Sequence, residues 1–227
     1  PGRVLHELAA RRITNVHLVP TMIGAMLQHP DANRVDLSAV RLLFYAASSM
    51  PAELLRSAMA VFNQCGFAQA YGSTEGGVVT VLDRQAHERA RTPDGEHLLR
   101  SCGRPMSGRA LRIVDAQGQG VPLGAIGEIE VASPDLMRGY WNDEAATRHV
   151  LRGEWLATGD LGYQDGEGFL YIVDRKNDLI VTGGENVYSA EVESAIYGHP
   201  DVAEVAVIGV PDAKWGEAVK ACVVPRP

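Results

Sequence analysis

Residues 171–193 read YIVDRKNDLIVTGGENVYSAEVE, and this segment is typical of a junction between two structural units. Two short apolar runs flank the charged cluster Asp174–Asp178. The pair Gly183–Gly184 follows, and glycine lets a ligand approach the backbone closely because it has no side chain. A helical pattern begins at Ser189 with acidic residues in its first turn, where the positive end of the helix dipole favours them. The alternative interpretation is a plain hairpin followed by a helix.

A second motif, YGSTE at residues 71–75, carries chemistry that suits a nucleotide. Tyr71 offers a ring face on which adenine can stack. The Thr74 hydroxyl can donate to a phosphate oxygen, and the Glu75 carboxylate can hold Mg²⁺. Gly72 would allow a tight turn after a strand. The alternative is a strand-to-loop turn with a solvated glutamate.

The third motif is Thr158-Gly159-Asp160. A carboxylate has enough acceptor sites for two neighbouring hydroxyls, which is the pattern of a ribose diol. Arg175, in the junction segment, offers a fork of donors for ribose or phosphate oxygens. The alternatives are a turn aspartate that caps backbone at Asp160 and a surface ion pair between Arg175 and Asp174.

The three motifs, in this order, resemble the adenylate-forming superfamily of acyl-CoA synthetases, peptide-synthetase adenylation domains and beetle luciferases. The resemblance runs from about Val16 to the last residue. It implies an α/β fold: the C-terminal half of the large acyl-adenylate-forming domain, with an α/β sheet and an antiparallel β subdomain, and the start of a small α+β C-terminal domain. It divides the chain into residues 1–100, 101–176 and 177–227.

The resemblance also assigns roles to individual residues. It implies that ATP or AMP is bound by Gln69, Ala70, Tyr71, Gly72, Thr74, Asp160 and Arg175. It makes Thr74 and Glu75 catalytic, with Mg²⁺ on Glu75, and it lines the coenzyme A tunnel with Gly183, Gly184 and Glu185. The substrate pocket would include Met22, Ala46, Ala47 and Ser48, and the hinge of the small domain would be Asn177.

The sequence departs from the family pattern at two of these places. Relatives usually carry two glycines where this chain has Ala46 and Ala47, so the pocket is expected to be tighter or shifted. Relatives carry Asp or Lys at the hinge, where this chain has Asn177. Asparagine tolerates unusual backbone angles and can therefore serve as a hinge.

The rest of the chain gives simpler expectations. Residues 42–45 read as a buried strand, and a helix with one apolar face follows Pro51. Residues 83–100 are polar and are expected to form an exposed helix or loop with a solvated face. Tyr140 and Trp141 are expected to pack in a core or an interface.

Composition narrows the class of protein. The chain has 227 residues and a net charge of −7, which argues against a nucleic-acid or anionic-membrane partner. No apolar run is long enough to form a transmembrane segment. Three cysteines far apart match no metal-ligand spacing and indicate a reducing compartment, so we expect a cytoplasmic protein.

The expected function is that of an ATP-dependent acyl-CoA ligase, an acid–thiol ligase acting on a fatty or similar apolar carboxylic acid, with homo-oligomers possible. The family's phosphate-binding loop and a lysine for the reacting carboxylate would lie outside these residues, so we expect the 227 residues alone to be inactive. One alternative is a fatty-acyl-AMP ligase or adenylation domain that serves a carrier protein. Another is a non-catalytic nucleotide-binding module.

Overall fold

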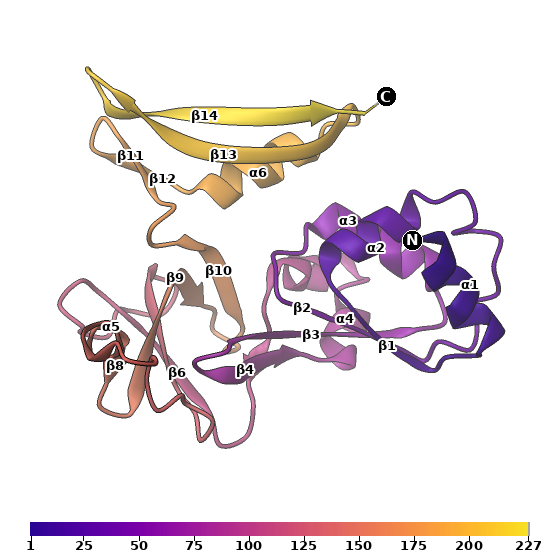
Figure 1. The fold of residues 1–227 in the computed structure, drawn as a ribbon, viewed down its shortest axis with the longest axis horizontal. Coiled ribbons are helices and arrows are strands. Elements are labelled where there is room, and N and C mark those ends of the chain that lie inside the picture. The colour runs from indigo at the N-terminus through magenta and orange to yellow at the C-terminus, as the bar shows by residue number, and fades with distance from the viewer. Residues whose placement is uncertain (227) are drawn as a thin grey trace.

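The computed structural model of the chain describes residues 1–226 and contains three β-sheets (Figure 1). The α/β class implied by the resemblance is confirmed, because one sheet has parallel strands with helices and another is antiparallel. No helix in this part of the chain is long and apolar enough to cross a membrane.

The first sheet has the order β1-β2-β3-β4-β5, and its first three strands are parallel. Its strands are β1 (Asn15–Leu18), β2 (Leu42–Ala46), β3 (Gly66–Ser73), β4 (Gly77–Leu82) and β5 (Arg104–Pro105). The accompanying helices are α1 (Gly2–Ala10), α2 (Pro20–Leu27), α3 (Ala52–Val61), α4 (Arg84–Arg89) and the 3-10 helix η1 (Pro93–Arg100). Pro51 is the residue before α3, and the expected inward face is confirmed because Leu55, Ala58 and Met59 are buried.

The expectation that residues 83–100 form a solvated face is wrong for one side of α4 and η1. His87, Leu98 and Leu99 are buried. The His87 Nε2 atom lies 2.9 Å from the Tyr45 hydroxyl, and His87 Nδ1 lies 2.8 Å from the Asp83 carbonyl oxygen. The segment is polar on average, but its few apolar residues lie on the face that meets the sheet.

The second sheet is antiparallel, with the order β10-β9-β7-β6 and β8 paired to β9. Its elements are β6 (Ala110–Val114), β7 (Gly127–Ala132), α5 (Glu144–Val150), β8 (Leu151–Arg152), β9 (Trp155–Gln164) and β10 (Leu170–Arg175). A separate core, which includes Ile113, Ile129 and Leu170, holds this sheet together. The expected packing of Tyr140 and Trp141 in a core is wrong, since they are 39% and 91% exposed, and the expected packing in an interface stays a prediction.

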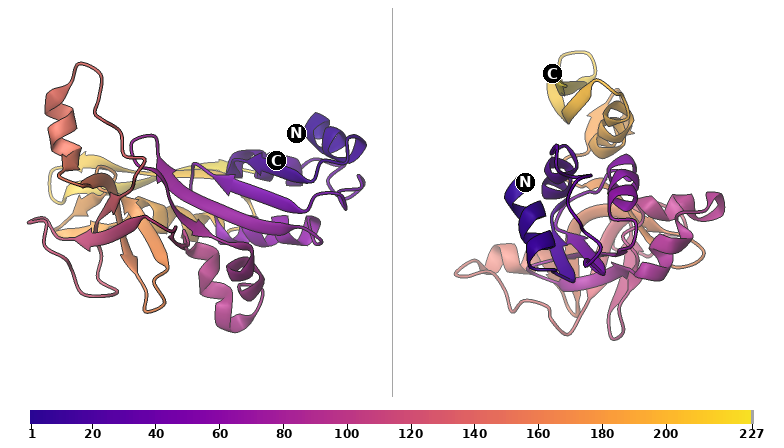
Figure 2. Two further views of the ribbon diagram at one scale, coloured as in Figure 1. Left: turned by 90° about the horizontal axis from the view of Figure 1, so that it is seen from below. Right: turned by 90° about the vertical axis from the view of Figure 1, so that its right-hand side faces the viewer.

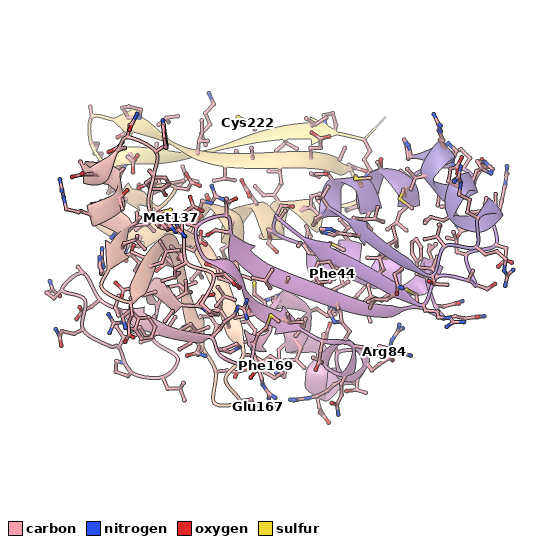
Figure 3. The ribbon with its side chains drawn as sticks, turned by 60° about the horizontal axis from the view of Figure 1, so that its bottom comes forward. Phe44, Arg84, Met137, Glu167, Phe169 and Cys222 are labelled. Carbon is pink, nitrogen blue, oxygen red and sulfur yellow. The ribbon has the colours of Figure 1, made fainter. Side chains whose placement is uncertain are left out.

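The turn between β9 and β10 ties the second sheet to α4. Glu167 in this turn accepts two hydrogen bonds from the Arg89 guanidinium, at 2.7 and 2.6 Å. The Arg104 guanidinium lies 4.0 Å above the centre of the Phe169 ring. Figure 3 shows Glu167 and Phe169 together at one edge of the molecule, on the side where Arg84 begins α4. These contacts hold β9 and β10 against the first sheet.

The third sheet has the strand order β12-β11-β14-β13, and the helix α6 packs against it. Its elements are β11 (Ile180–Thr182), β12 (Glu185–Val187), α6 (Ser189–Tyr197), β13 (Val202–Asp212) and β14 (Gly216–Pro225). The local backbone is thus a hairpin followed by a helix, as the simpler interpretation of this segment predicts. Figures 1 and 2 show β13 and β14 standing apart from the first sheet, with α6 on the side that faces it.

One buried contact joins β10 to α6. The Asp174 carboxylate accepts hydrogen bonds from the backbone N–H of Ser189 and from its hydroxyl, whose Oγ lies 3.0 Å from Oδ2. Both residues are buried. Asp174, in the second sheet, therefore caps the first turn of α6, which packs on the third sheet.

Candidate functional site

Three of the expected ligand-binding residues form a cluster around Asp160. The Tyr71 hydroxyl, from β3, donates to Asp160 Oδ2 at 2.6 Å. The Arg175 Nε atom, at the end of β10, lies 3.7 Å from Asp160 Oδ1. Tyr71 and Asp160 are 89 residues apart in the sequence and meet because β3 and β9 approach each other here. Arg175 pairs with Asp160 and not with Asp174, so the surface ion pair considered as its alternative does not form.

The backbone of Asp160 is held through Thr158, which links β9 to β7. Its backbone N–H donates to Thr158 Oγ1 at 3.1 Å, and that hydroxyl donates to the Ile129 carbonyl at 2.8 Å. Gly159, between them, has a φ of +76°, a conformation that favours glycine. Asp160 lies inside a strand and is not a turn aspartate that caps backbone, so that alternative is wrong.

Burial and the neighbouring groups have opposite effects on the pKa of Asp160, and their net effect on Tyr71 is a raised pKa. Burial raises the pKa of Asp160, and the Tyr71 hydroxyl and the Arg175 charge act against that rise. Burial, together with the Asp160 charge, raises the pKa of Tyr71 well above its usual value. Tyr71 is therefore protonated at neutral pH and donates to the carboxylate. The site presents one carboxylate with a hydrogen-bond donor on Oδ2 and a guanidinium charge near Oδ1, and a diol could replace both as donors.

Gln69 and Ala70 precede Tyr71 in β3 and are buried. The Gln69 amide Nε2 lies 3.8 Å from the Cys102 sulfur, so this side chain packs behind the cluster. Burial raises the pKa of the Cys102 thiol to about 12, which keeps it neutral.

The expected tight turn at Gly72 of the YGSTE motif is wrong. No tight turn begins there, because β3 continues to Ser73 with a register irregularity between Tyr71 and Gly72. A Cβ at Gly72 would lie 2.0 Å from the Gly77 carbonyl oxygen, so close pairing of the two strands requires glycine.

Thr74 and Glu75 form the turn after β3. Thr74 is exposed, and Glu75 is half-buried. The Tyr140 hydroxyl donates to Glu75 Oε1 at 3.0 Å. A backbone hydrogen bond within Glu75 and the Tyr140 hydroxyl hold the pKa of this carboxyl below its usual value, against the effect of burial.

A magnesium ion would be compatible with Glu75. Within residues 1–226, no group of three or more His, Cys, Asp or Glu side chains is arranged to hold a metal. Mg²⁺ needs only one or two protein carboxylates when substrate phosphates and water supply its other oxygens. An ionised, half-buried carboxylate beside the exposed Thr74 fits that requirement.

The expected substrate-pocket residues lie beside the cluster or at the surface. Ala46 ends β2 and pairs with Ala70 of β3, so Ala47 and Ser48 follow at the same edge of the sheet as Tyr71. Ala47 has a φ of +78°, which is unfavourable for any residue with a Cβ. Met22, on α2, is 41% exposed.

The residues expected to line a coenzyme A tunnel lie in the third sheet. Gly183 and Gly184 form the turn between β11 and β12 with φ of +60° and +88°, values that suit a two-residue hairpin turn. This turn geometry explains both glycines without a ligand. Glu185 and Asn177 are exposed, and Asn177 does not use the left-handed backbone angles that asparagine tolerates.

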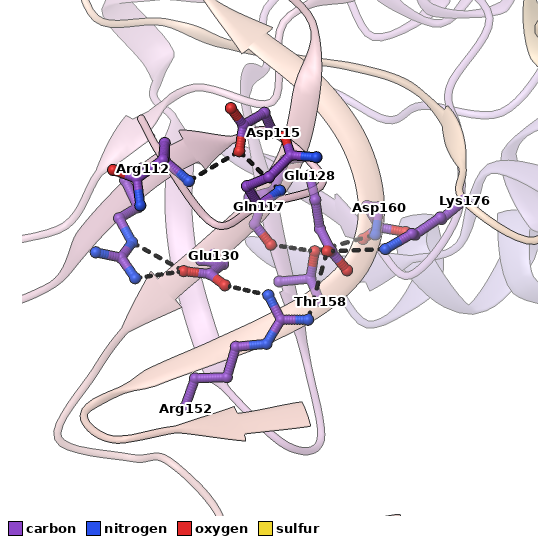
Figure 4. Close-up of polar contacts among 11 residues, drawn as sticks. Arg112, Asp115, Gln117, Glu128, Glu130, Arg152, Thr158, Asp160 and Lys176 are labelled. Atoms are coloured by element: carbon purple, nitrogen blue, oxygen red, sulfur yellow. Dashed lines mark hydrogen bonds and ion pairs between the residues drawn. The ribbon is translucent and has the colours of Figure 1, made fainter. Parts of the chain in front are cut away.

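A buried charge network near the cluster was not expected. Glu130 is fully buried and accepts from Arg112 at 2.8 Å and from Arg152 at 2.7 Å. Glu128 accepts from Lys176, the residue after Arg175, at 3.1 Å (Figure 4). The alternation of Glu128 and Glu130 in a strand places both on one face, but their basic partners are distant in sequence.

The chain matches two descriptions of protein families. Residues 1–141 match the family described as AMP-binding enzyme, and residues 191–227 match the AMP-binding enzyme C-terminal domain.

Three curated relatives illustrate the similarity. The medium/long-chain-fatty-acid–CoA ligase FadD8 of Mycobacterium tuberculosis is 44% identical over 227 residues, which are 100% of this chain and 38% of the relative. A feruloyl-CoA synthase of Amycolatopsis is 42% identical, over 99% of this chain and 44% of its own length. The fatty acid–[acyl-carrier-protein] ligase ScoC of Streptomyces coeruleorubidus is 40% identical, over 95% of this chain and 40% of its own. The chain thus spans less than half of each relative.

Solved structures agree with the sequence comparison. The amide bond synthetase McbA from Marinactinospora thermotolerans superposes with a TM-score of 0.90 at 37% identity, over 100% of this chain and 44% of that one. The o-succinylbenzoate CoA synthetase MenE of Bacillus subtilis, in complex with its acyl-adenylate intermediate, gives 0.85 at 35% identity, over 100% and 44%. The match to the AMP-binding enzyme family spans residues 1–141, which are more than half of this chain. The chain therefore belongs to the AMP-binding enzyme family.

Proposed function

We propose that the complete protein carrying this chain is an ATP-dependent acid–thiol ligase that joins a fatty or similar apolar carboxylic acid to coenzyme A. The observation that best supports this function is the Tyr71–Asp160–Arg175 cluster, in which a protonated phenol and a guanidinium flank one carboxylate. Relatives named as CoA ligases for fatty and aromatic acids support the substrate class.

In this proposal Asp160 accepts the two ribose hydroxyls, and Arg175 donates to ribose or phosphate oxygens. The ring of Tyr71 stacks on adenine, with Gln69, Ala70 and Gly72 behind it. Thr74 donates to a phosphate oxygen, and Glu75 is the protein ligand of Mg²⁺. The loop of Ala46, Ala47 and Ser48, with Met22, borders the substrate pocket.

The reaction would proceed in two displacements. The carboxylate oxygen of the acid attacks the α-phosphorus of ATP, and the bond to pyrophosphate breaks. A thiol sulfur then attacks the activated carbonyl, and AMP leaves. Bound Mg²⁺ would offset the negative charge of the phosphates. Arg175 and the Thr74 hydroxyl would add donors where charge develops during the first step.

The unit after Asn177 has a separate proposed role. Rotation about Asn177 would bring the Gly183–Gly184 turn and Glu185 toward the thiol, so that one site serves both steps. We also propose that the chain divides into three units, with boundaries after residues 100 and 176. The same proposal includes a cytoplasmic location and allows a homo-oligomer. Three free cysteines, of which Cys222 is exposed, support a reducing compartment.

Two relatives favour a different acceptor. ScoC is named as a ligase of an acyl carrier protein, and McbA as an amide bond synthetase. The acceptor in either case would attack the same activated carbonyl. The proposal would then keep the adenylation and replace coenzyme A by a carrier-protein thiol or an amine.

The test uses the complete protein with ATP, Mg²⁺ and a panel of carboxylic acids, with and without coenzyme A, while AMP is followed. AMP that accumulates with one class of acid and only with coenzyme A supports the ligase. AMP formation that needs a carrier protein or an amine supports the alternative acceptors. A complete absence of AMP refutes both and favours a non-catalytic nucleotide-binding module.

Two carboxamide variants test the site itself. Asp160→Asn removes a charged acceptor and should weaken nucleotide binding roughly 10- to 100-fold. The matched control is Asp94→Asn, because Asp94 is an exposed carboxylate in η1. Equal nucleotide affinity in both variants would refute the role of Asp160.

A further inference from the structure

We infer that Tyr140 is a positioning residue for the Glu75 carboxylate and that it helps to fix the direction in which Glu75 presents this carboxylate to a divalent cation. This inference rests on the proposed role of Glu75 as the Mg²⁺ ligand. Tyr140 belongs to the loop between β7 and α5, which is remote from Glu75 in the sequence.

The loop between β7 and α5 holds Glu75 at two points. The Tyr140 hydroxyl donates to Glu75 Oε1 at 3.0 Å. The Met137 backbone N–H donates to the Glu75 carbonyl oxygen at 2.7 Å. One contact fixes the side chain and the other fixes the backbone, so the carboxylate is restrained although it lies in a turn. The Ser73 hydroxyl and the Glu75 backbone N–H also interact with this carboxylate, and the Tyr140 phenol adds a contact from a remote part of the chain.

Tyr140 is itself held in place by α5. Its backbone N–H donates to Thr147 Oγ1 at 2.9 Å, and that hydroxyl donates to the Asp143 carbonyl oxygen at 2.8 Å. The preceding Gly139 has a φ of +147°, and a Cβ there would lie 2.9 Å from the Thr147 side chain. The first turn of α5 therefore sets the position of Tyr140, and Tyr140 sets that of Glu75.

The restraint matters because Glu75 would act with little help from other protein groups. In the part of the chain that the structure describes, no acidic or histidine cluster could hold a metal. A cation at Glu75 would depend on one protein oxygen and on oxygens of the nucleotide and water. The orientation of the Glu75 carboxylate would then have a large effect on how well a cation is held there.

Tyr140 does not have the burial of a structural tyrosine. It is 39% exposed, and its neighbour Trp141 is 91% exposed. Replacing the hydroxyl by hydrogen should therefore leave the fold intact. A role in packing alone would predict a change in stability on Tyr140→Phe, and a positioning role predicts a change in cation dependence.

The experiment compares Tyr140→Phe with the unaltered complete protein. Binding of a fluorescent ATP analogue is titrated with Mg²⁺ and, separately, in EDTA. We expect the Mg²⁺ concentration for half-maximal binding to rise about three- to tenfold, which corresponds to the free energy of one hydrogen bond. The affinity for the ATP analogue in EDTA should stay the same. The apparent KM for Mg²⁺ in AMP formation should rise in parallel.

Two further variants separate the possible failures. Tyr163→Phe is the matched control, because Tyr163 lies in β9 with its ring stacked on Tyr171 and should leave the Mg²⁺ dependence unchanged. Glu75→Gln tests the proposed metal ligand directly. If Glu75→Gln leaves the Mg²⁺ dependence unchanged, the role of Glu75 in the proposed function fails. If Glu75→Gln changes it but Tyr140→Phe does not, only the positioning role of Tyr140 is overturned.

Discussion

Removing the hydroxyl that α6 offers to Asp174 should loosen that helix without unfolding the rest of the chain. The Ser189 Oγ atom lies 3.0 and 3.2 Å from the two Asp174 carboxylate oxygens, and both residues are less than 10% exposed, at 7% and 6%. A hydrogen bond to a charged group contributes about 1.5–3 kcal/mol, and water has little access to replace this donor. We expect Ser189→Ala to cost about 2 kcal/mol of α6 stability.

Hydrogen exchange measures that cost locally. If α6 opens as a unit, about 2 kcal/mol corresponds to roughly 30-fold faster exchange of its amides, while β2 and β3 exchange at their former rates. Asp174→Asn should have a larger effect, because it also removes a negative charge from the N-terminus of the helix.

The control is Ser194→Ala, which removes an exposed hydroxyl from the same helix. Unchanged exchange of α6 in Ser189→Ala would mean that the carboxylate does not hold the helix, and the reasoning from burial and distance would be refuted. Equal acceleration in both variants would show that the loss is not specific to the contact with Asp174, because serine-to-alanine changes by themselves favour the helix.

Two other predictions concern backbone strain and pH. Ala47→Gly should raise the free energy of unfolding by about 1 kcal/mol in urea denaturation, because the φ of +78° is costly for alanine and not for glycine; a loss of stability would refute the strain. Burial lowers the pKa of His87 in the folded protein, so the unfolded chain binds a proton more readily. The free energy of unfolding should therefore fall as the pH drops below about 6.5, the pKa of histidine in the unfolded chain. His87→Gln should make this fall less steep between about pH 6.5 and 5. An unchanged slope would mean that other titratable groups, and not His87, control the pH dependence in this range.

The sequence predicts the fold class and the main cluster because these depend on local patterns in a fixed order. The motifs around Tyr71, Asp160 and Arg175 occur in the order that the family resemblance implies, and the structure brings their side chains together. The turn at Gly183–Gly184 is also predictable, since two adjacent glycines suit a hairpin with positive φ.

Other parts of the site depend on contacts that no local pattern reveals. Tyr140 reaches Glu75 across 65 residues, and Asp174 reaches Ser189 across a hairpin. Gly72 looks like a turn residue in sequence, but its backbone pairs closely with the neighbouring strand. In each case the partner is set by the packing of sheets, which the sequence pattern of either residue does not specify.

Asp174 and Arg175 are neighbours in β10, and adjacent side chains of a strand point to opposite faces. One of them holds α6, and the other faces Asp160. If a ligand that contacts Arg175 moves β10, the contact between Asp174 and α6 changes as well, and thermodynamic reciprocity then requires the coupling to be equal in both directions. The factor by which a nucleotide changes the opening of α6 is then the factor by which opening of α6 changes nucleotide affinity. A substitution at Ser189 would thus report on ligand binding at Asp160 without touching the ligand.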